Sequence, residues 1–254
     1  MTSLQLLHSD VIACKRCRRL RTHCTEIARI RRKAYQDQEY WGKPVPGFGD
    51  PAARLWIIGL APGAHGANRT GRVFTGDRSG DFLFAGLHRA GFANQPTSQH
   101  RNDGLVLRDC YVSAAVHCAP PDNKPTPAEI DNCSRFLDTE WQLLKDKRCI
   151  LALGGIAWNA ALALAERCGD LRLDRRPSFG HGATCSLSPE CCLIGCYHTS
   201  QQNTFTGRLT PDMLDSVLNQ CATAIRIAAR HASRAVHRSV ATESFAAADR
   251  HRPA

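Results

Sequence analysis

The sequence predicts an α/β protein, a three-layer αβα sandwich around a short parallel sheet of four strands. Short apolar runs alternate along the chain with segments of helical spacing, which is typical of a parallel sheet covered by helices on both faces. The length of 254 residues suits one such domain with extensions. A hydrophobic content of 43% and a charged content of 22% are ordinary for a globular protein and exclude a wholly disordered chain.

Four short apolar runs are the expected strands, and they lie at Arg54–Gly59, Asp109–Val116, Cys149–Leu153 and Cys191–Tyr197. The carboxyl ends of parallel strands meet at one edge of the sheet, where ligand sites of such folds lie. We therefore expect the loops that begin at Ala61, His117 and His198 to converge on one site.

The expected helices are Asp81–Ala90, Pro127–Leu144, Gly155 to about Cys168, and Pro211–Ala229. The second has the clearest start, because Thr126 suits the N-cap, Pro127 suits the first turn and Glu129 completes a capping box. Thr210 is the expected cap of the last helix.

The chain is expected to have three parts: a basic N-terminal arm over 1–50, a body over 51–230, and a disordered tail over 231–254. The segment Lys43–Pro51 is rich in Pro and Gly, so we expect a loop between the arm and the body. The net charge is +10, and the first 34 residues carry nine basic side chains against two acidic ones. This concentration indicates either a nucleic-acid-binding surface or a solvated face without a partner.

The chain has 13 cysteines, an odd number that cannot pair completely within one chain. Residues 1–18 do not have the pattern of a secretory signal, and no apolar stretch approaches the roughly 20 residues of a membrane span. We therefore expect a cytoplasmic protein with reduced thiols, in which clustered cysteines indicate metal or redox chemistry.

Cys14 and Cys17 form a C-x2-C pair that fits zinc, an iron–sulfur cluster or a redox dithiol. Cys118 and Cys133 flank a Pro-rich loop and are the expected partner pair. Four thiolates suit either zinc or a [4Fe–4S] cluster. Cys24 is a spare that could compete, and the other eight cysteines are expected to pack as small apolar residues.

The loop Gly59–Asp77 contains five glycines, which free its backbone to approach a ligand closely. It matches neither common nucleotide-binding glycine pattern, so a nucleotide cofactor is not favoured. This loop closely resembles the first motif of the uracil-DNA glycosylase superfamily, in its family-five (type-b) branch. The segments His117–Pro127 and Tyr197–Leu209 extend the resemblance over most of the body. Similar proteins carry a [4Fe–4S] cluster at the positions of Cys14, Cys17, Cys118 and Cys133.

The resemblance implies hydrolysis of the bond between a deaminated base and deoxyribose after the base is flipped into a pocket. Asp77 would orient water and stabilise the sugar cation, a role needed because Ala61 stands where most branches have an acidic or amide residue. A helix cap is the alternative role of Asp77. His198 would donate a hydrogen bond to the departing base, and Phe74 would stack on it.

The remaining expected contacts are looser: the backbone at Ala61 and Gly63 for the base edge, Ser200, Gln201, Gln202 and Asn203 for the space left in the duplex, and Arg208, Arg69 and Arg72 for phosphates. The stretch Ser113–Val116 lacks the Asn with which some relatives read uracil, so we expect a broad pocket that accepts uracil and hypoxanthine. The expected partner is DNA containing deaminated bases. We expect the protein to be a monomer and not to bind a membrane. The alternatives are a non-catalytic, metal-stabilised DNA-binding module and an iron–sulfur redox enzyme.

Overall fold

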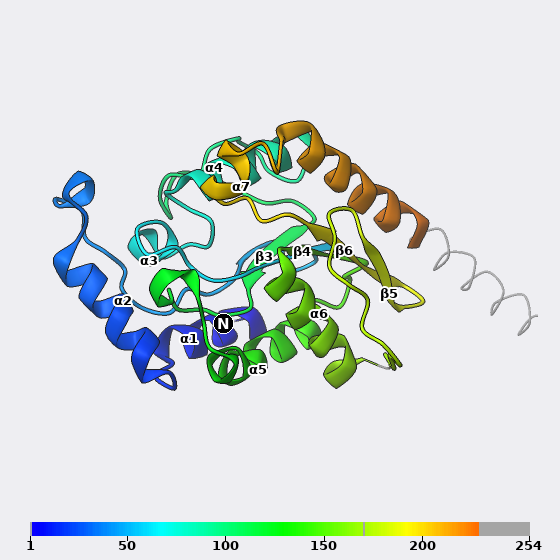
Figure 1. The fold of residues 1–254 in the computed structure, drawn as a ribbon, viewed down its shortest axis with the longest axis horizontal. Coiled ribbons are helices and arrows are strands. Elements are labelled where there is room, and N and C mark those ends of the chain that lie inside the picture. The colour runs from blue at the N-terminus through cyan, green and yellow to red at the C-terminus, as the bar shows by residue number, and fades with distance from the viewer. Residues whose placement is uncertain (1, 170, 229–254) are drawn as a thin grey trace, which may run out of the picture.

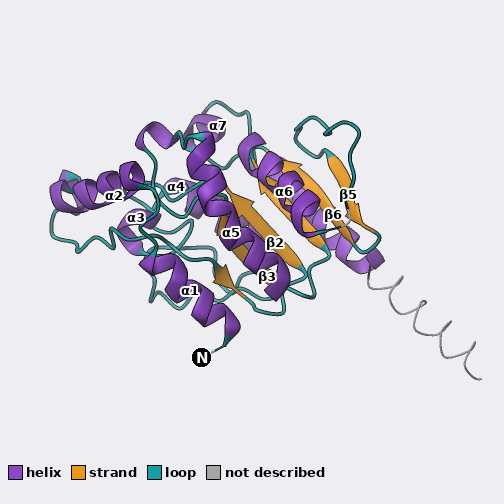
Figure 2. Cartoon of the chain, turned by 90° about the horizontal axis from the view of Figure 1, so that it is seen from below, coloured by secondary structure: helices purple, strands orange, loops and turns teal. Residues whose placement is uncertain are grey.

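The computed structural model describes residues 2–169 and 171–228, and a mixed sheet of six strands forms its centre (Figures 1 and 2). The strand order is β1-β3-β2-β4-β6-β5. The four inner strands are mutually parallel and match the expected ones: β2 (Leu55–Gly59), β3 (Cys110–Ala114), β4 (Cys149–Leu153) and β6 (Cys191–Cys196). The predicted fold class and its parallel four-stranded centre are therefore confirmed.

Two antiparallel edge strands were not predicted. β1 (Phe48–Gly49) pairs with β3 inside the expected loop, and β5 (Thr184–Ser188) pairs with β6. β1 has only two residues, too few for a periodic signal. β5 is only partly buried, with Leu187 as its one buried residue, and it otherwise carries Ser, Thr and Cys, so it lacks the apolar run that marks a buried strand.

Helices cover both faces of the sheet. The helices α1 (Ser3–Ala13), α5 (Pro127–Leu143) and α6 (Gly155–Cys168) pack on one face, and α4 (Arg78–Arg89) and a helix over 211–228 pack on the other (Figure 1). The expected capping box is present, because the Thr126 hydroxyl accepts from the Glu129 amide and the Glu129 side chain accepts from the Thr126 amide.

The basic N-terminal segment is helical and partly buried. α1 is followed by α2 (Arg18–Ile30), and the side chains of Leu7, Val11, Leu20 and Cys24 belong to the hydrophobic core. The predicted disordered tail, 231–254, lies outside the described residues. Among the residues described, no helix has the length and apolar character needed to cross a bilayer.

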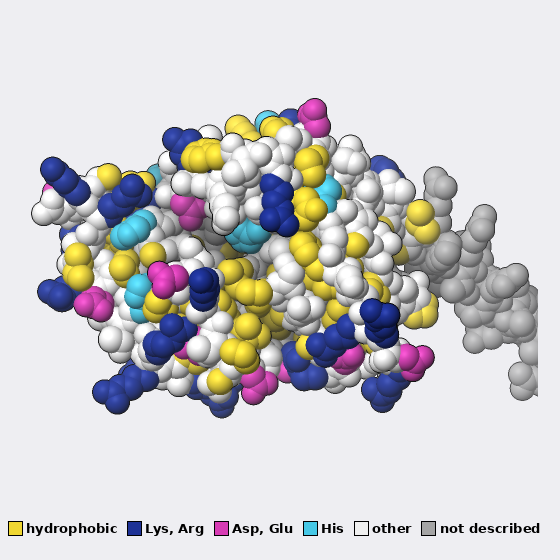
Figure 3. Space-filling view, viewed as in Figure 1, with side chains coloured by type: hydrophobic (Ala, Val, Ile, Leu, Met, Phe, Trp, Pro, Cys, Tyr) yellow, Lys and Arg dark blue, Asp and Glu magenta, His cyan; other side chains and the backbone are white. Residues whose placement is uncertain are grey.

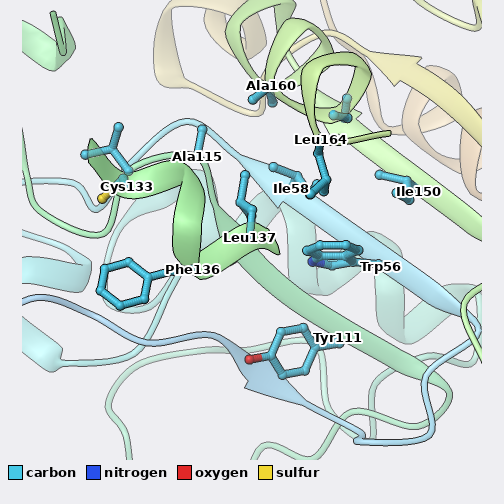
Figure 4. Packing of buried hydrophobic residues seen from close by; sticks show 14 of the residues in the cluster. Trp56, Ile58, Tyr111, Ala115, Cys133, Phe136, Leu137, Ile150, Ala160 and Leu164 are labelled. Carbon is cyan, nitrogen blue, oxygen red and sulfur yellow. The ribbon is translucent and has the colours of Figure 1, made fainter. Parts of the chain in front are cut away.

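The sheet is fully buried at its centre, so it provides a rigid base for the loops that follow its strands. Trp56 and Ile58 of β2 face α5 and α6, and they belong to the same buried cluster as Leu137 of α5 and Leu164 of α6 (Figure 4). The alternate β2 side chains pack against α4 and the helix over 211–228. Because β2, β3, β4 and β6 are parallel, their following loops emerge at the same edge of the sheet.

Candidate active site

A groove of about 1130 Å³ lies beyond the carboxyl ends of the parallel strands. Its lining comes from segments far apart in the sequence: Arg32, Tyr35 and Gln38; Gly63 to Gly66; Gly76 to Ser79; Asn123; and Ser200 to Gln202 with Phe205. Lys and Arg side chains lie on several sides of the hollow at the centre of the face in Figure 3. All three loops expected to converge, those that begin at Ala61, His117 and His198, contribute to this lining, the second of them through Asn123.

Asp77 lies in this groove and uses its two carboxylate oxygens differently. Oδ1 accepts the Gly80 amide at 3.0 Å, so Asp77 does cap α4. Oδ2 faces the glycine loop so closely that a Cβ atom on Gly66 would lie 1.8 Å from it, and one on Gly63 would lie 2.8 Å from it. The helix cap therefore fixes the carboxylate against the loop and leaves one oxygen for chemistry.

Burial raises the pKa of Asp77 above its ordinary value of 3.8. The charge of Asp81 raises it further, whereas the amides of Gly80 and Ser79 and the charge of Arg69 lower it. A carboxylate with a raised pKa and an oxygen free of the cap is suited to orienting water or stabilising a cation.

Phe74 and His198 lie next to each other, with ring centroids 6.1 Å apart. Phe74 has a φ of +48°, and its ring occupies the space that a Cβ on Gly59 would fill, at 2.6 Å. Burial lowers the pKa of His198 to about 4, so the imidazole is neutral at pH 7. Among the described residues, its ring nitrogens form no hydrogen bond, and neither His198 nor Phe74 belongs to the groove lining.

The other expected contacts divide into two groups. Gly63, Ser200 and Gln201 line the groove. Ala61 packs against the core instead, and the Arg208 guanidinium lies over the Tyr197 ring at 4.8 Å; neither lines the groove.

The expectation that Arg72 meets a phosphate is wrong for this structure. Its side chain is 5% exposed and forms an ion pair with Asp103 at 2.8 Å. Arg69, in contrast, lines the groove, although it also donates to the backbone oxygens of His65 and Gly76 at 2.7 and 2.6 Å. Both arginines hold the glycine loop in shape.

The four expected ligand cysteines line one small cavity on the α1–α5 side of the molecule. Cys14 ends α1 and Cys17 precedes α2, so both lie in the turn between these helices. Cys118 follows β3, and Cys133 is within α5. Burial raises the pKa of Cys133 to about 12, and the three other thiols contribute to this shift.

Two buried polar atoms beside these cysteines, Nη1 of Arg21 and Nε2 of His117, have no hydrogen-bond partner among the residues that the structure describes. Cys24 lies close to Cys118, but its thiol donates to the Ala119 oxygen at 3.6 Å and does not line the cavity. Within 2–169 and 171–228, no three His, Cys, Asp or Glu side chains are close enough to hold a single metal ion.

Comparison with known proteins identifies the family. Residues 46–222 match the profile described as the Uracil DNA glycosylase superfamily. The chain belongs to this superfamily. It is 53% identical over 215 residues to the type-5 uracil-DNA glycosylase of Mycobacterium tuberculosis (strain CDC 1551 / Oshkosh), which covers 84% of this chain and 79% of that protein.

Two further relatives show to which branch of the superfamily the chain belongs. The type-5 uracil-DNA glycosylase of Thermus thermophilus is 49% identical over 206 residues, 81% of this chain and 91% of that protein. The type-4 uracil-DNA glycosylase of Pyrobaculum aerophilum is only 29% identical over 161 residues, 63% of this chain and 73% of that protein. This member of the superfamily is thus of the type-5 branch, and the predicted resemblance is confirmed.

The structure of this type-5 chain adds groove residues that the sequence analysis missed. Asn123 lines the groove with a φ of +56°, and His65, Arg78 and Phe205 line it as well. Phe205 has an exposed fraction of 67%, although it is a large aromatic residue. Asn and Asp tolerate a positive φ, so the Asp-Asn pair after two prolines was a usable signal. No sequence signal pointed to Phe205, because a large aromatic residue is expected to be buried.

Proposed function

We propose that this chain is a uracil-DNA glycosylase that flips a deaminated base out of DNA and hydrolyses its N-glycosidic bond, leaving an abasic site. The observation that carries the proposal is the Asp77 carboxylate, which is fixed in a groove where the strand loops converge and keeps one oxygen for the reaction. A non-catalytic DNA-binding module would have no use for this arrangement or for the neutral, unpaired imidazole of His198.

Asp77, His198 and Phe74 have different roles, which follow from the charges that develop during the reaction. Cleavage builds positive charge on the sugar and negative charge on the leaving base, and a catalyst stabilises both. Asp77 orients the water and stabilises the sugar cation. His198 is neutral because its pKa is about 4, so one ring nitrogen donates a hydrogen bond to the departing base. The Phe74 ring beside it stacks on the flipped base.

The pocket is expected to accept uracil and hypoxanthine. Ser113 is the polar residue in the stretch Ser113–Val116, where some relatives have an Asn that reads uracil. Its hydroxyl is buried and accepts the Trp56 indole N–H at 2.9 Å. The next residues, Ala114 and Ala115, have no side-chain polar group. Without a bidentate amide from this strand, discrimination between bases is weak. Comparable cleavage of uracil- and inosine-containing duplexes would support this breadth, and a sharp preference for uracil would contradict it.

Asp77→Asn tests the activity because it separates the helix cap from the charge. Asn caps helices as well as Asp does, so the variant keeps the acceptor for the Gly80 amide and α4 stays intact. Loss of a positioned acid–base group costs about 10²–10⁴-fold in rate. We expect a loss of this size in alkali-labile abasic sites formed in uracil-containing DNA. An Asp77→Asn protein as fast as the parent would overturn the role of this residue.

We propose further that Cys14, Cys17, Cys118 and Cys133 hold a structural [4Fe–4S] cluster. All four line one cavity, and an anionic cluster would meet the unpartnered Nη1 of Arg21 there. Among the described residues no three His, Cys, Asp or Glu side chains are grouped to hold a single metal ion, which favours a cluster with its own iron and sulfide atoms over zinc. The cluster would tie the turn between α1 and α2 to β3 and α5.

Elemental analysis of protein purified without oxygen tests the cluster. We expect iron and acid-labile sulfide in equal amounts, with a visible absorption that Cys17→Ser removes. Cys168→Ser is the matched control, because Cys168 is also partly exposed and does not line the cavity. Stoichiometric zinc without iron or sulfide would overturn the proposal.

A further inference from the structure

A second group of cysteines lies at the other end of the sheet. Cys149 is the first residue of β4, and its Cα is paired with that of Cys192, the second residue of β6. Side chains of paired residues on adjacent strands project from the same face. This face is the one that the helix over 211–228 covers, whereas the ligand cysteines pack on the opposite face.

The side chains of this group pack in one cluster. Cys149 and Cys221 are both buried there, Cys192 packs against them, and Cys221 is in the helix over 211–228. Cys149 and Cys221 are fully buried, but Cys192 is partly exposed. A small oxidant from solvent therefore reaches this group through Cys192.

The spacing suits a bond between two of these residues. Neighbouring strands lie about 4.7–4.9 Å apart, and the Cα atoms of a disulfide are usually about 4.4–6.8 Å apart. The paired positions of Cys149 and Cys192 meet this condition without movement of the strands. The neighbouring Cys149 thiol also lowers the pKa of the Cys192 thiol, which increases its thiolate fraction.

We propose that Cys192 and Cys149 form a peroxide-sensitive thiol pair, in which Cys192 reacts with a hydroperoxide and Cys149 resolves the product to a disulfide. In the first step the Cys192 sulfur takes one peroxide oxygen, the O–O bond breaks, and water or an alcohol leaves. In the second step the Cys149 sulfur displaces hydroxide from the sulfenic acid, and its own proton leaves with that hydroxide as water. An added dithiol reverses the reaction and becomes a disulfide itself.

The pair protects Cys192 from irreversible oxidation, because the disulfide forms before a second peroxide arrives. The bond would also clamp β4 to β6. It lies at the amino ends of these strands, opposite the groove at their carboxyl ends, so it does not depend on the proposed glycosylase activity.

The test uses the purified protein with its metal content intact, freed of thiol, treated with hydrogen peroxide, alkylated and digested. We expect the Cys149 and Cys192 peptides to be joined, and two alkylatable thiols to be lost and then restored by a dithiol. Cys192→Ser should leave Cys149 as a free thiol. Cys149→Ala should stop Cys192 at a sulfenic acid that dimedone traps. The visible absorption of the proposed cluster reports separately on its ligands Cys14, Cys17, Cys118 and Cys133.

Cys191→Ser is the matched control. Cys191 is adjacent in sequence, but it packs on the opposite face and its Cα is paired with Ser188 of β5. We expect this variant to form the same bond as the parent. A parent protein in which Cys149 stays free while Cys192 is overoxidised, or in which Cys149 is joined to Cys221, would overturn the proposal.

Discussion

The guanidinium of Arg78 lies over the ring of Phe205, 5.3 Å from its centre. Arg78 is the first residue of α4, directly after Asp77, and Phe205 is the last residue of α7 (Gln201–Phe205). Both line the groove, and Phe205 remains 67% exposed. The pair thus places a cation and an aromatic face at the edge of the groove, which is the combination that binds a phosphate and an unstacked base.

Phe205→Ala should weaken binding to DNA that holds an abasic-site analogue. A base stacked on an aromatic side chain contributes about 1–3 kcal/mol, so Kd should rise by roughly one to two orders of magnitude. Fluorescence anisotropy at fixed salt measures this effect. Val106→Ala is the control, since Val106 is 52% exposed and does not line the groove. Equal losses in both variants would remove Phe205 from the DNA-binding surface.

Gly66→Ala should reduce the rate by displacing the Asp77 carboxylate. The backbone at Gly66 has a φ of −98° and a ψ of −103°, outside the regions that alanine prefers, and the added Cβ also conflicts with the carboxylate oxygen 1.8 Å away. A misplacement of this kind costs about 10²-fold in kcat. Single-turnover cleavage measures it. Gly180→Ala is the control, because its Cβ would only meet that of Ala183 at 3.5 Å. An active Gly66→Ala protein would show that Asp77 need not stay against the loop.

Asp81→Asn should move the acid limb of kcat/KM to lower pH. The proposed role of Asp77 needs its ionised form, so activity is present above the Asp77 pKa and is lost as pH falls through it. The negative charge of Asp81 raises that pKa, and its removal lowers it. The Gln99 side-chain amide donates to Asp81 Oδ1 at 3.2 Å, and the side-chain oxygen of Asn in the variant can accept the same hydrogen bond. Asp215→Asn, which breaks the surface ion pair with Arg89, should leave the limb in place. An unchanged acid limb in Asp81→Asn would assign it to another group.

The four inner strands were predictable because each is a short apolar run between breakers, and the start of α5 was predictable because Thr126 and Glu129 have the chemistry of a capping box. The two roles of Asp77 were not separable in sequence, since capping and catalysis both need a carboxylate before a helix. Arg72 shows the main limit. Its charge predicts a surface contact, but its partner Asp103 is distant in sequence, and only the fold brings them together.

A buried carboxyl far from the groove connects α1 to the sheet. Glu140 of α5 is 1% exposed. Its Oε1 accepts the Tyr111 hydroxyl at 3.1 Å, and its Oε2 has no hydrogen-bond partner within the described part of the chain. His8 of α1 lies 3.0 Å from the same hydroxyl through its Nε2. Burial raises the pKa of Glu140 to about 8, so this carboxyl is largely protonated at pH 7.

Glu140→Gln should make stability less dependent on pH. The ordinary pKa of Glu140 is 4.5, so between pH 4.5 and about 8 the folded chain holds a proton that the unfolded chain has released. The contribution of Glu140 to stability is complete below pH 4.5 and is lost as pH rises through about 8, at up to about 1.4 kcal/mol per pH unit. The neutral Gln side chain avoids this loss and still accepts the Tyr111 hydrogen bond.

The apparent Tm of Glu140→Gln relative to the parent should therefore increase between pH 5 and 8 and then level off, when measured at constant ionic strength. Glu190→Gln is the control, since Glu190 is an exposed residue 3.6 Å from Arg148 and should give a constant difference. Because the buried histidines titrate identically in both proteins, they cancel in this comparison. Parallel Tm curves for Glu140→Gln and the parent would mean that Glu140 is already charged in the folded chain at neutral pH.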